Sequence, residues 1–252
     1  MYNEAQLVEQ IKSLGIAPED IVTIHISLKA VGEIDDHEKS GAEVMISALR
    51  KCLSKGLLLV PAHTYKNIRE TPVFDIRNTK PCIGTLPGVA VQLANEAYDR
   101  GDKTCVRSMH QSHSVVAFGE KAYEYVEDDR RAFTPTPGYG SYGKLREVNG
   151  KILLIGVDFS KNTFFHAVDE YIEPEAMDPP YDITAIDYDG TVTARQARNC
   201  SGDASQYVKY EPYLREFGAL KYGQIGDAKA ILCDAKVCFD EVVKKRDFLL
   251  AQ

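Results

Sequence analysis

The segment of residues 151–170 restricts the possible folds of this chain more than any other. It begins with four consecutive apolar residues, 152–155, which Gly156 ends. An apolar run without polar alternation is typical of a strand buried on both faces, as found in parallel sheets. We therefore predict a central strand here, followed by a polar connector and a helix capped by Asn162 or Thr163.

The helix predicted after this connector brings an imidazole and two carboxylates together. His166 precedes Asp169 by three residues and Glu170 by four, and both spacings place the side chains on one helical face. A histidine–carboxylate pair just beyond a buried strand is suited to acid–base chemistry. The ordinary alternative for His166 alone is a hydrogen-bonded histidine of the core.

Two further predicted strands favour a parallel sheet. Residues 20–28 are rich in β-branched side chains, residues 41–52 have helical periodicity, and residues 56–61 form a second apolar strand. A strand–helix–strand order predicts parallel pairing, and such sheets bind their ligands beyond the carboxyl ends of the strands. Polar side chains follow these ends at His25, Ser27, His63 and Tyr65 and in residues 158–161.

The last third of the chain is predicted to add a hairpin and a terminal helix. Asp189-Gly190 between two alternating segments indicates a hairpin over residues 181–195. We expect a turn at 223–226, a strand at 228–233 and a helix at 235–250. The predicted fold class is therefore α/β: a single domain over residues 1–252 with a mostly parallel central sheet flanked by helices, plus a C-terminal hairpin and helix extension.

Charge and composition exclude several kinds of partner. The net charge is −7, and no basic block longer than residues 244–246 offers a footprint for nucleic acid. No apolar run reaches the length of a membrane span, and the polar N-terminus does not resemble a signal peptide. Six dispersed cysteines without a C-x-x-C pair favour a reducing compartment, so we expect a cytoplasmic protein. The acidic balance is compatible with a cationic substrate, although it also serves solubility alone.

Several motifs match known sites only in part. Residues 138–143 spell G-x-G-x-x-G, but the preceding Thr-Pro-Thr-Pro cannot be the buried strand that a dinucleotide site requires. The histidines lack metal-ligand spacing, so no metal is expected. Ser27 with His25 lacks a nucleophile elbow, and Cys105 with His110 is a weak candidate for a nucleophile–base pair.

Residues 107–114 combine one arginine with hydroxyl and imidazole side chains. Arg107, Ser108 and His110 are followed by Ser112 and Ser114. A guanidinium with several short donors suits a phosphate or pyrophosphate. The alternative is an ordinary polar turn.

Several blocks in order together resemble the aminoglycoside 3-N-acetyltransferase family. They span roughly residues 4 to 248 and comprise residues 22–28 with Gly32, 58–61, 74–75, 84–87, 107–110, 141–145, 153–157, 162–166 and 226–228. The resemblance implies a fold distinct from that of the common small N-acetyltransferases. The phosphate loop of that other fold is absent, since Pro135 stands where its Gln or Arg would be.

The resemblance also implies roles for individual residues. The family's N-T-x-x-H-x-x-E pattern places the catalytic histidine at His166 and its carboxylate at Asp169, with Glu170 beside it. Asp169 is one methylene shorter than the usual Glu, which leaves open whether Glu170 shares its role. The family's coenzyme A-binding blocks map to Ser27, Leu28, Lys29, Val31 and Gly32 and to Arg107, Ser108 and His110. Gln111 departs from the proline that usually follows this last histidine.

The implied function is transfer of an acetyl group from acetyl-CoA to a primary amine of a small cationic acceptor. The leading candidate is the 3-amino group of an aminoglycoside antibiotic. His166 is the expected general base and Thr163 a candidate for oxyanion stabilisation. Tyr65, Asp75 and Asp169 are candidates for binding the acceptor, and the protein is expected to be a monomer or a homodimer. The alternatives are a CoA-thioester hydrolase, an acetyltransferase for other amines and a catalytically weak CoA-binding protein.

Overall fold

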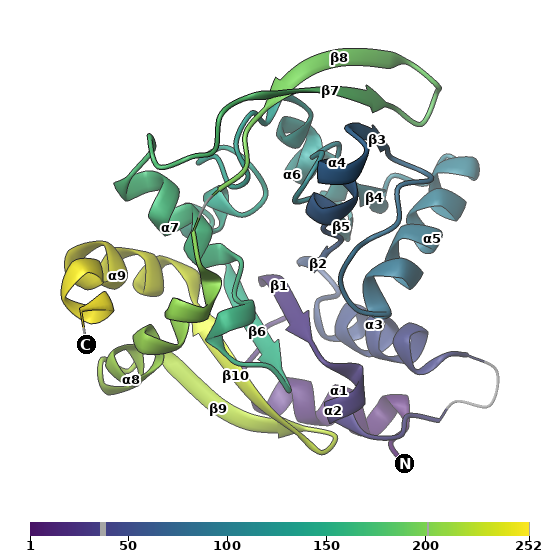
Figure 1. Cartoon of the computed structure of the whole chain (residues 1–252). Helices are drawn as coiled ribbons and strands as arrows, with labels where there is room; N and C mark the ends of the chain where they lie inside the picture. Colours follow the sequence, from purple (N-terminus) through teal and green to yellow (C-terminus); the bar gives the residue numbers. More distant parts are fainter. Residues whose placement is uncertain (36–38, 201, 252) are drawn as a thin grey trace.

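A seven-stranded sheet forms the centre of the computed structural model, which describes residues 1–35, 39–200 and 202–251 (Figure 1). The strand order is β4-β5-β2-β1-β6-β10-β9. These strands are β1 (Ile21–Ile26), β2 (Leu57–Pro61), β4 (Cys105–Arg107), β5 (Val115–Phe118), β6 (Lys151–Ile155), β9 (Leu220–Ile225) and β10 (Ala228–Asp234). The predicted α/β class, with helices on both faces of the sheet, is confirmed.

The predicted central strand is β6, and its side chains are buried on both faces. Residues 152–155 are all 0% exposed. Leu153 and Ile155 pack into the apolar cluster on one face, whereas Ile152 and Leu154 pack into the cluster on the other. This alternation follows from the two-residue period of a strand, so the unbroken apolar run is explained by a layer of helices on each side.

The parallel part of the sheet is smaller than predicted. β1 pairs in parallel with β2 and β6, whereas β5, β10, β4 and β9 pair antiparallel with their neighbours. The predicted turn at residues 223–226 is wrong, because β9 runs to Ile225 and the turn lies at Gly226 and Asp227. A turn this short joins β9 to β10 as a hairpin, which requires antiparallel strands.

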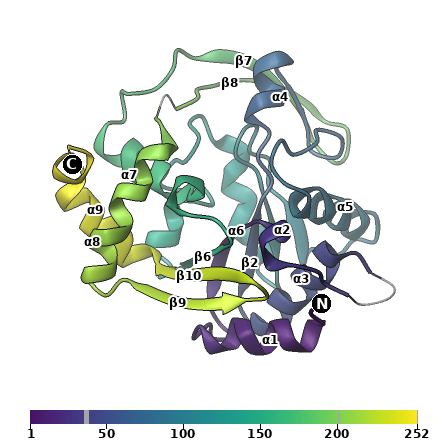
Figure 2. The ribbon, with the colours of Figure 1, turned by 60° about the horizontal axis from the view of Figure 1, so that its bottom comes forward.

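Helices cover both faces of the sheet (Figure 1, Figure 2). One face is covered by α1 (Glu4–Ser13), α3 (Gly41–Cys52) and α5 (Leu86–Asp99). The other is covered by α6 (Ala122–Val126), α7 (Phe164–Ile172), α8 (Tyr210–Glu216) and α9 (Ala235–Leu250). Within the described ranges, no helix combines the length and the apolar character needed to cross a membrane.

A short element follows the carboxyl end of each of the three parallel strands. α2 (Leu28–Val31) follows β1, α4 (Tyr65–Glu70) follows β2, and the 3-10 turn η3 (Phe159–Lys161) follows β6. The remaining 3-10 turns are η1 (Glu127–Arg131), η2 (Gly143–Arg146) and η4 (Ala204–Lys209).

The hairpin predicted around Asp189-Gly190 is present but belongs to a separate sheet. β7 (Tyr181–Ile186) and β8 (Val192–Ala197) pair with each other, and β7 also pairs in parallel with β3 (Val73–Asp75). This three-stranded sheet encloses its own apolar cluster around Phe74 and Ile183. It lies beside α4 in both views (Figure 1, Figure 2).

Gly156 fixes the path of the chain from β6 towards η3. Its φ is +64°, and a Cβ there would lie 2.4 Å from the Cβ of Ala30 in α2. We expect Gly156→Ala to lower the free energy of unfolding by about 1–3 kcal/mol, since a non-glycine residue is strained at this φ and also clashes. Urea unfolding measures this. Gly101→Ala is the matched control, because Gly101 has a φ of +71° but nothing within 4 Å of a Cβ. An equal loss of unfolding free energy in the two variants would contradict a role for the contact with α2.

Candidate functional site

A cavity of about 620 Å³ lies at the edge of the sheet where β1, β2 and β6 end. Its walls include His25 and Ile26 from β1, Pro61 and His63 at the end of β2, and Val157 just past β6. Further walls come from three residues of α4 and from the segments around residues 82–87, 160–166 and 199–204. The lining residues of these three segments are Cys82, Ile83, Gly84, Leu86, Pro87, Ser160, Lys161, Thr163, His166, Asn199, Cys200, Gly202 and Ala204. This is where the sequence pattern predicts a ligand site for an α/β sheet.

Five of the six histidines of the chain gather at this cavity or directly behind it. The ring centroids of His63 and His113 are 4.7 Å apart, those of His110 and His113 are 5.8 Å apart, and those of His113 and His166 are 6.3 Å apart. His25 lines the same cavity, and its Nε2 is buried without a hydrogen-bond partner in the described structure. The sixth histidine, His37, lies outside the described residues. No group of His, Cys, Asp or Glu side chains within the described ranges is arranged to hold a metal ion.

Burial keeps these imidazoles neutral. It lowers the pKa of His25 to about 3, and it lowers the pKa values of His63, His110, His113 and His166 below their usual range. Neutral imidazoles accept and donate hydrogen bonds but bring no charge into the cavity.

These lowered pKa values predict that mild acid destabilises the protein. An unfolded histidine has a pKa of about 6.5, so below this pH the unfolded chain binds protons that the folded chain does not. Stability is therefore complete above about pH 7 and falls as the pH drops, by about 2 kcal/mol at pH 5 for each histidine that stays neutral. Thermal unfolding between pH 5 and 7.5 measures the loss. His25→Gln should have a shallower pH dependence, and an unfolding temperature that does not change between pH 5 and 7 would contradict this explanation.

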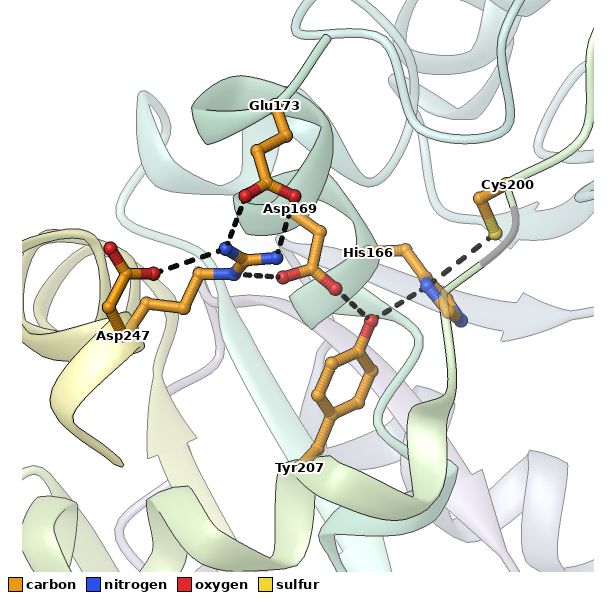
Figure 3. Close-up of polar contacts among 7 residues, drawn as sticks. His166, Asp169, Glu173, Cys200, Tyr207 and Asp247 are labelled. Carbon is orange, nitrogen blue, oxygen red and sulfur yellow. Dashed lines mark hydrogen bonds and ion pairs between the residues drawn. The ribbon is translucent and has the colours of Figure 1, made fainter. Parts of the chain in front are cut away.

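His166 lies on the first turns of α7 and is tied to Asp169 through a tyrosine rather than directly (Figure 3). The hydroxyl of Tyr207 lies 2.7 Å from His166 Nδ1 and donates a hydrogen bond of 2.6 Å to Asp169 Oδ2. Tyr207 comes from η4, where it packs against Phe165 and Tyr210. Burial, together with the nearby Asp169 carboxylate, raises the pKa of Tyr207 far above its usual value, so its hydroxyl stays protonated.

This geometry sets the tautomer of His166. The single hydroxyl hydrogen of Tyr207 points to the carboxylate of Asp169, so the tyrosine oxygen accepts from Nδ1–H. Nε2 is then unprotonated, and in Figure 3 it points away from Tyr207 and Asp169. Because His166 lines the cavity, this nitrogen is available to a ligand as a base.

Asp169 is held in place by α9. Arg246 donates from Nε to Asp169 Oδ1 at 3.0 Å and uses both terminal nitrogens on Glu173, at 2.9 and 3.0 Å (Figure 3). One oxygen of Asp169 therefore faces Arg246 and the other faces Tyr207. A carboxylate fixed in this way orients its partner without moving.

Glu170 holds a loop in place rather than hydrogen-bonding to His166 or Tyr207. Its carboxylate accepts from the hydroxyl of Thr134 and from the backbone N–H (2.9 Å) and hydroxyl (3.0 Å) of Thr136. It therefore anchors the Thr-Pro-Thr-Pro loop, and the connection to His166 runs through Asp169.

Thr163 and Tyr65 both line the cavity, as a role at the reaction centre requires. Thr163 lies directly before α7 and its side chain does not cap the helix, whereas Asn162 Oδ1 accepts from Phe164 N. Tyr65 begins α4 and stacks on His113 with the centroids 5.9 Å apart. Asp75 is not among the lining residues, because its carboxylate accepts from the N–H groups of Arg77 and Asn78.

The two blocks predicted to bind coenzyme A occupy different environments. Ser27 caps α2 at the end of β1, directly after Ile26 of the cavity wall, and Gly32 ends α2 with a φ of +88°. Leu28, Lys29 and Val31 lie within α2, and the Lys29 side chain is exposed. This block therefore lies beside the cavity, although none of its residues lines it.

The Arg107 block is buried behind the cavity instead. Arg107 is 1% exposed and donates to the carbonyls of Ile76 and Thr79 at 2.8 and 2.9 Å. Ser108 accepts from Val115 N, and His110 bonds the carbonyl of Thr134. In this arrangement these side chains hold the surrounding loops, and their binding of coenzyme A stays a prediction.

Sequence reasoning missed Tyr207, Cys200 and Arg246. Each lies 34 to 77 residues from its partner on α7, so no local spacing identifies it. Cys200 Sγ lies 3.6 Å from His166 Nδ1, and burial raises the pKa of its thiol to about 11. Burial also raises the pKa of Cys105 to about 12. Both therefore stay protonated thiols at neutral pH, which disfavours them as nucleophiles.

Comparison with known proteins gives consistent matches. The model of the aminoglycoside 3-N-acetyltransferase family matches residues 23–246. Aminoglycoside N(3)-acetyltransferase IV of Salmonella sp is 24% identical, with 92% of this chain and 82% of the relative covered. Aminoglycoside N(3)-acetyltransferase III of Serratia marcescens is 27% identical, with 74% and 71% covered.

Solved structures have the same fold. A mutant of aminoglycoside acetyltransferase AAC(3)-IVa in complex with a gentamicin superposes with a TM-score of 0.81 at 22% identity, covering 99% of this chain and 90% of that one. AAC-IIIb in a binary complex with CoASH has a TM-score of 0.80 at 20% identity, covering 98% and 96%. YokD from Bacillus subtilis has a TM-score of 0.78 at 20% identity, covering 96% and 98%.

Proposed function

Because the chain belongs to the aminoglycoside 3-N-acetyltransferase family, we propose that it transfers the acetyl group of acetyl-CoA to a primary amine, with His166 as the general base. The observation that carries this role is the series of contacts Arg246–Asp169–Tyr207–His166, which ends at the cavity. It fixes the imidazole, keeps Nδ1 protonated and leaves Nε2 as a base next to the ligand space.

The proposed reaction requires one base, one oxyanion stabiliser and a positioned amine. The amine nitrogen attacks the thioester carbonyl while its proton passes to Nε2 of His166. The developing oxyanion accepts a hydrogen bond from the hydroxyl of Thr163, which lines the cavity. When the C–S bond breaks, the proton on Nε2 passes to the sulfur, giving an acetamide and free CoA. Asp169, acting through Tyr207, stabilises the transient imidazolium.

The proposed place for acetyl-CoA is the side of the cavity formed by β1 and β6. Lys161 at the end of η3 lines the cavity, and Lys29 in α2 is exposed nearby, so both are available to phosphate groups. α2 and η3 follow neighbouring strands. Ser27, which caps α2, donates from its backbone N–H to the carbonyl of Ile155 at the end of β6, at 2.9 Å. The complex of a structural relative with CoASH supports this co-substrate.

Two acceptor classes are candidates. The names of the relatives, and the gentamicin complex of one of them, support the 3-amino group of an aminoglycoside. An amine of a different kind is favoured by one feature of this chain, namely that no carboxylate is among the described residues that line the cavity.

Release of CoA from acetyl-CoA tests the proposed function. We expect release only when an amine is added, with one acetylated amine formed for each CoA. The protein's own free cysteines require a blank without acetyl-CoA. Release without any amine would instead identify a thioester hydrolase, and CoA binding in calorimetry without release on any amine would identify a binding protein.

A further inference from the structure

The charge of the cavity wall points to the chemical class of the acceptor. The wall contains three cations, Lys66, Arg69 and Lys161, and no Asp or Glu among the residues that the structure describes. A polycationic acceptor is held by carboxylates, whereas cations hold an anion. We propose that the acceptor amine also carries an anionic oxygen group, a phosphate or a carboxylate, which Lys66 and Arg69 bind. This inference rests on the proposed acetyl transfer and adds the class of its acceptor.

The three carboxylates that the sequence associates with the reaction centre or the acceptor are engaged elsewhere. Asp169 is shared between Tyr207 and Arg246, and Glu170 is bound to the loop of residues 134–136. Asp75 accepts from the backbone of its own turn. None of the three is therefore presented to a polycation in the cavity.

Lys66 and Arg69 form a matched pair on α4. They are three residues apart, which places them on one helical face, and both line the cavity. Lys66 has no ion-pair partner within the described residues. Arg69 approaches Asp178 at 3.9 Å, with the two side chains 59% and 40% exposed, a contact that solvent screens strongly. Two neighbouring cations repel each other, so an anion between them removes a repulsion and gains two charge-assisted hydrogen bonds.

The topology separates this pair from the proposed acetyl-CoA side. β1 lies between β2 and β6 in the sheet, so α4, which follows β2, and η3, which follows β6, enter the cavity from opposite sides of β1. α4 leads into the small sheet, where Thr184 N donates to the carbonyl of Pro72. Figure 1 shows α4 beside that sheet and apart from α7. Lys161 is accordingly assigned to coenzyme A and the α4 pair to the acceptor.

A small acceptor can reach both His166 and α4. Tyr65, the residue before Lys66, stacks on His113, and His113 lies next to His166. The two sites are thus joined by a wall of three neighbouring rings. An amine at Nε2 of His166 places an anionic group a few bonds away next to α4. The reaction is unchanged: the N–C bond forms, the C–S bond breaks, and the amine proton passes through His166 to the sulfur.

Matched amines test the proposal through CoA release. O-phosphoethanolamine is compared with ethanolamine, 4-aminobutanoate with butylamine, and gentamicin serves as the polycation. We expect at least one anionic amine to have a kcat/KM more than tenfold above that of its counterpart without the anionic group and above that of gentamicin. The two pairs also distinguish a phosphate from a carboxylate.

Charge reversal locates the binding groups. Lys66→Glu and Arg69→Glu should each raise KM for the preferred anionic amine at least tenfold and leave KM for acetyl-CoA within twofold. Lys161→Glu should instead raise KM for acetyl-CoA at least tenfold and leave KM for the amine within twofold. Lys121→Glu, at an exposed lysine outside the cavity wall, is the matched control and should change neither constant.

The outcomes separate the two proposals. Gentamicin turning over faster than every anionic amine would overturn the acceptor class while leaving acetyl transfer intact. A second contrary result is that Lys66→Glu and Arg69→Glu raise KM for acetyl-CoA and leave KM for the amine unchanged. That result would assign the pair to coenzyme A and would also overturn the proposed acceptor class. If no amine of the panel releases CoA, the proposed function fails and the acceptor class falls with it.

Discussion

Replacing His166 with alanine is expected to lower kcat for amine acetylation by about 10²–10⁴, the usual contribution of a general base. The side chain lines the cavity, and its Nε2 is the one basic nitrogen that the contacts with Tyr207 leave free on this ring. The fold should survive, since His166 is half-buried at the cavity wall. CoA release under saturating acetyl-CoA and amine measures the effect.

His166→Gln is the control for this variant. A glutamine can still donate a hydrogen bond to Tyr207 but cannot take a proton at neutral pH, so it should be as inactive as the alanine variant while unfolding at the wild-type temperature. Free imidazole in solution should partly restore activity to His166→Ala and not to His166→Gln. A kcat within tenfold of wild type in either variant would remove His166 from the role of base.

Removing only the hydroxyl of Tyr207 should have the next largest effect. Tyr207→Phe takes away the acceptor of Nδ1–H and the donor to Asp169. We expect kcat to fall about tenfold to a hundredfold, a part of the roughly 10²–10⁴ that the base contributes as a whole. The base should also become weaker. A neutral base is active above its pKa, so the acid limb of the kcat/KM profile should move to lower pH.

Tyr210→Phe provides the matched control. Tyr210 stacks on Tyr207 with the centroids 5.7 Å apart, and its hydroxyl makes no hydrogen bond in the described structure. Its removal should leave both kcat and the pH profile close to those of wild type. If Tyr207→Phe and Tyr210→Phe gave the same profile, the hydroxyl of Tyr207 would have no positioning role.

The sequence was sufficient to predict the centre of the fold. The run at residues 152–155 required apolar neighbours on both faces, and β6 has them. It is not sufficient for β9, because Gly223 indicates a turn in the local sequence. Gly223 lies inside the strand, and a Cβ there would lie 2.5 Å from Leu14 Cδ2. This glycine allows α1 to approach the sheet, a tertiary requirement that the local sequence does not show.

The same limit explains what could be predicted of the site. Helical spacing brought both Asp169 and Glu170 within reach of His166, and the spacing alone cannot choose between them. The choice is made by distant partners: Thr134 and Thr136 engage Glu170, whereas Tyr207 and Arg246 engage Asp169.

The Arg107 block shows that a motif suited to a ligand can bind the protein's own backbone instead. Its residue types suit a phosphate, yet the same donors satisfy buried backbone carbonyls, such as that of Ile76. Burial decides which partner a donor meets, and burial is a property of the fold rather than of the motif.

Whether His166 presents an unprotonated Nε2 to the cavity is measured most directly by ¹⁵N–¹H correlation of the imidazole rings at pH 7. The His166 signals are assigned by their loss in His166→Gln. The contacts with Tyr207 and Asp169 predict a neutral ring that carries its proton on Nδ1, and the same ring in Tyr207→Phe should lose this strict preference. A ring protonated on Nε2, or an imidazolium at pH 7, would contradict the assignment of His166 as the base.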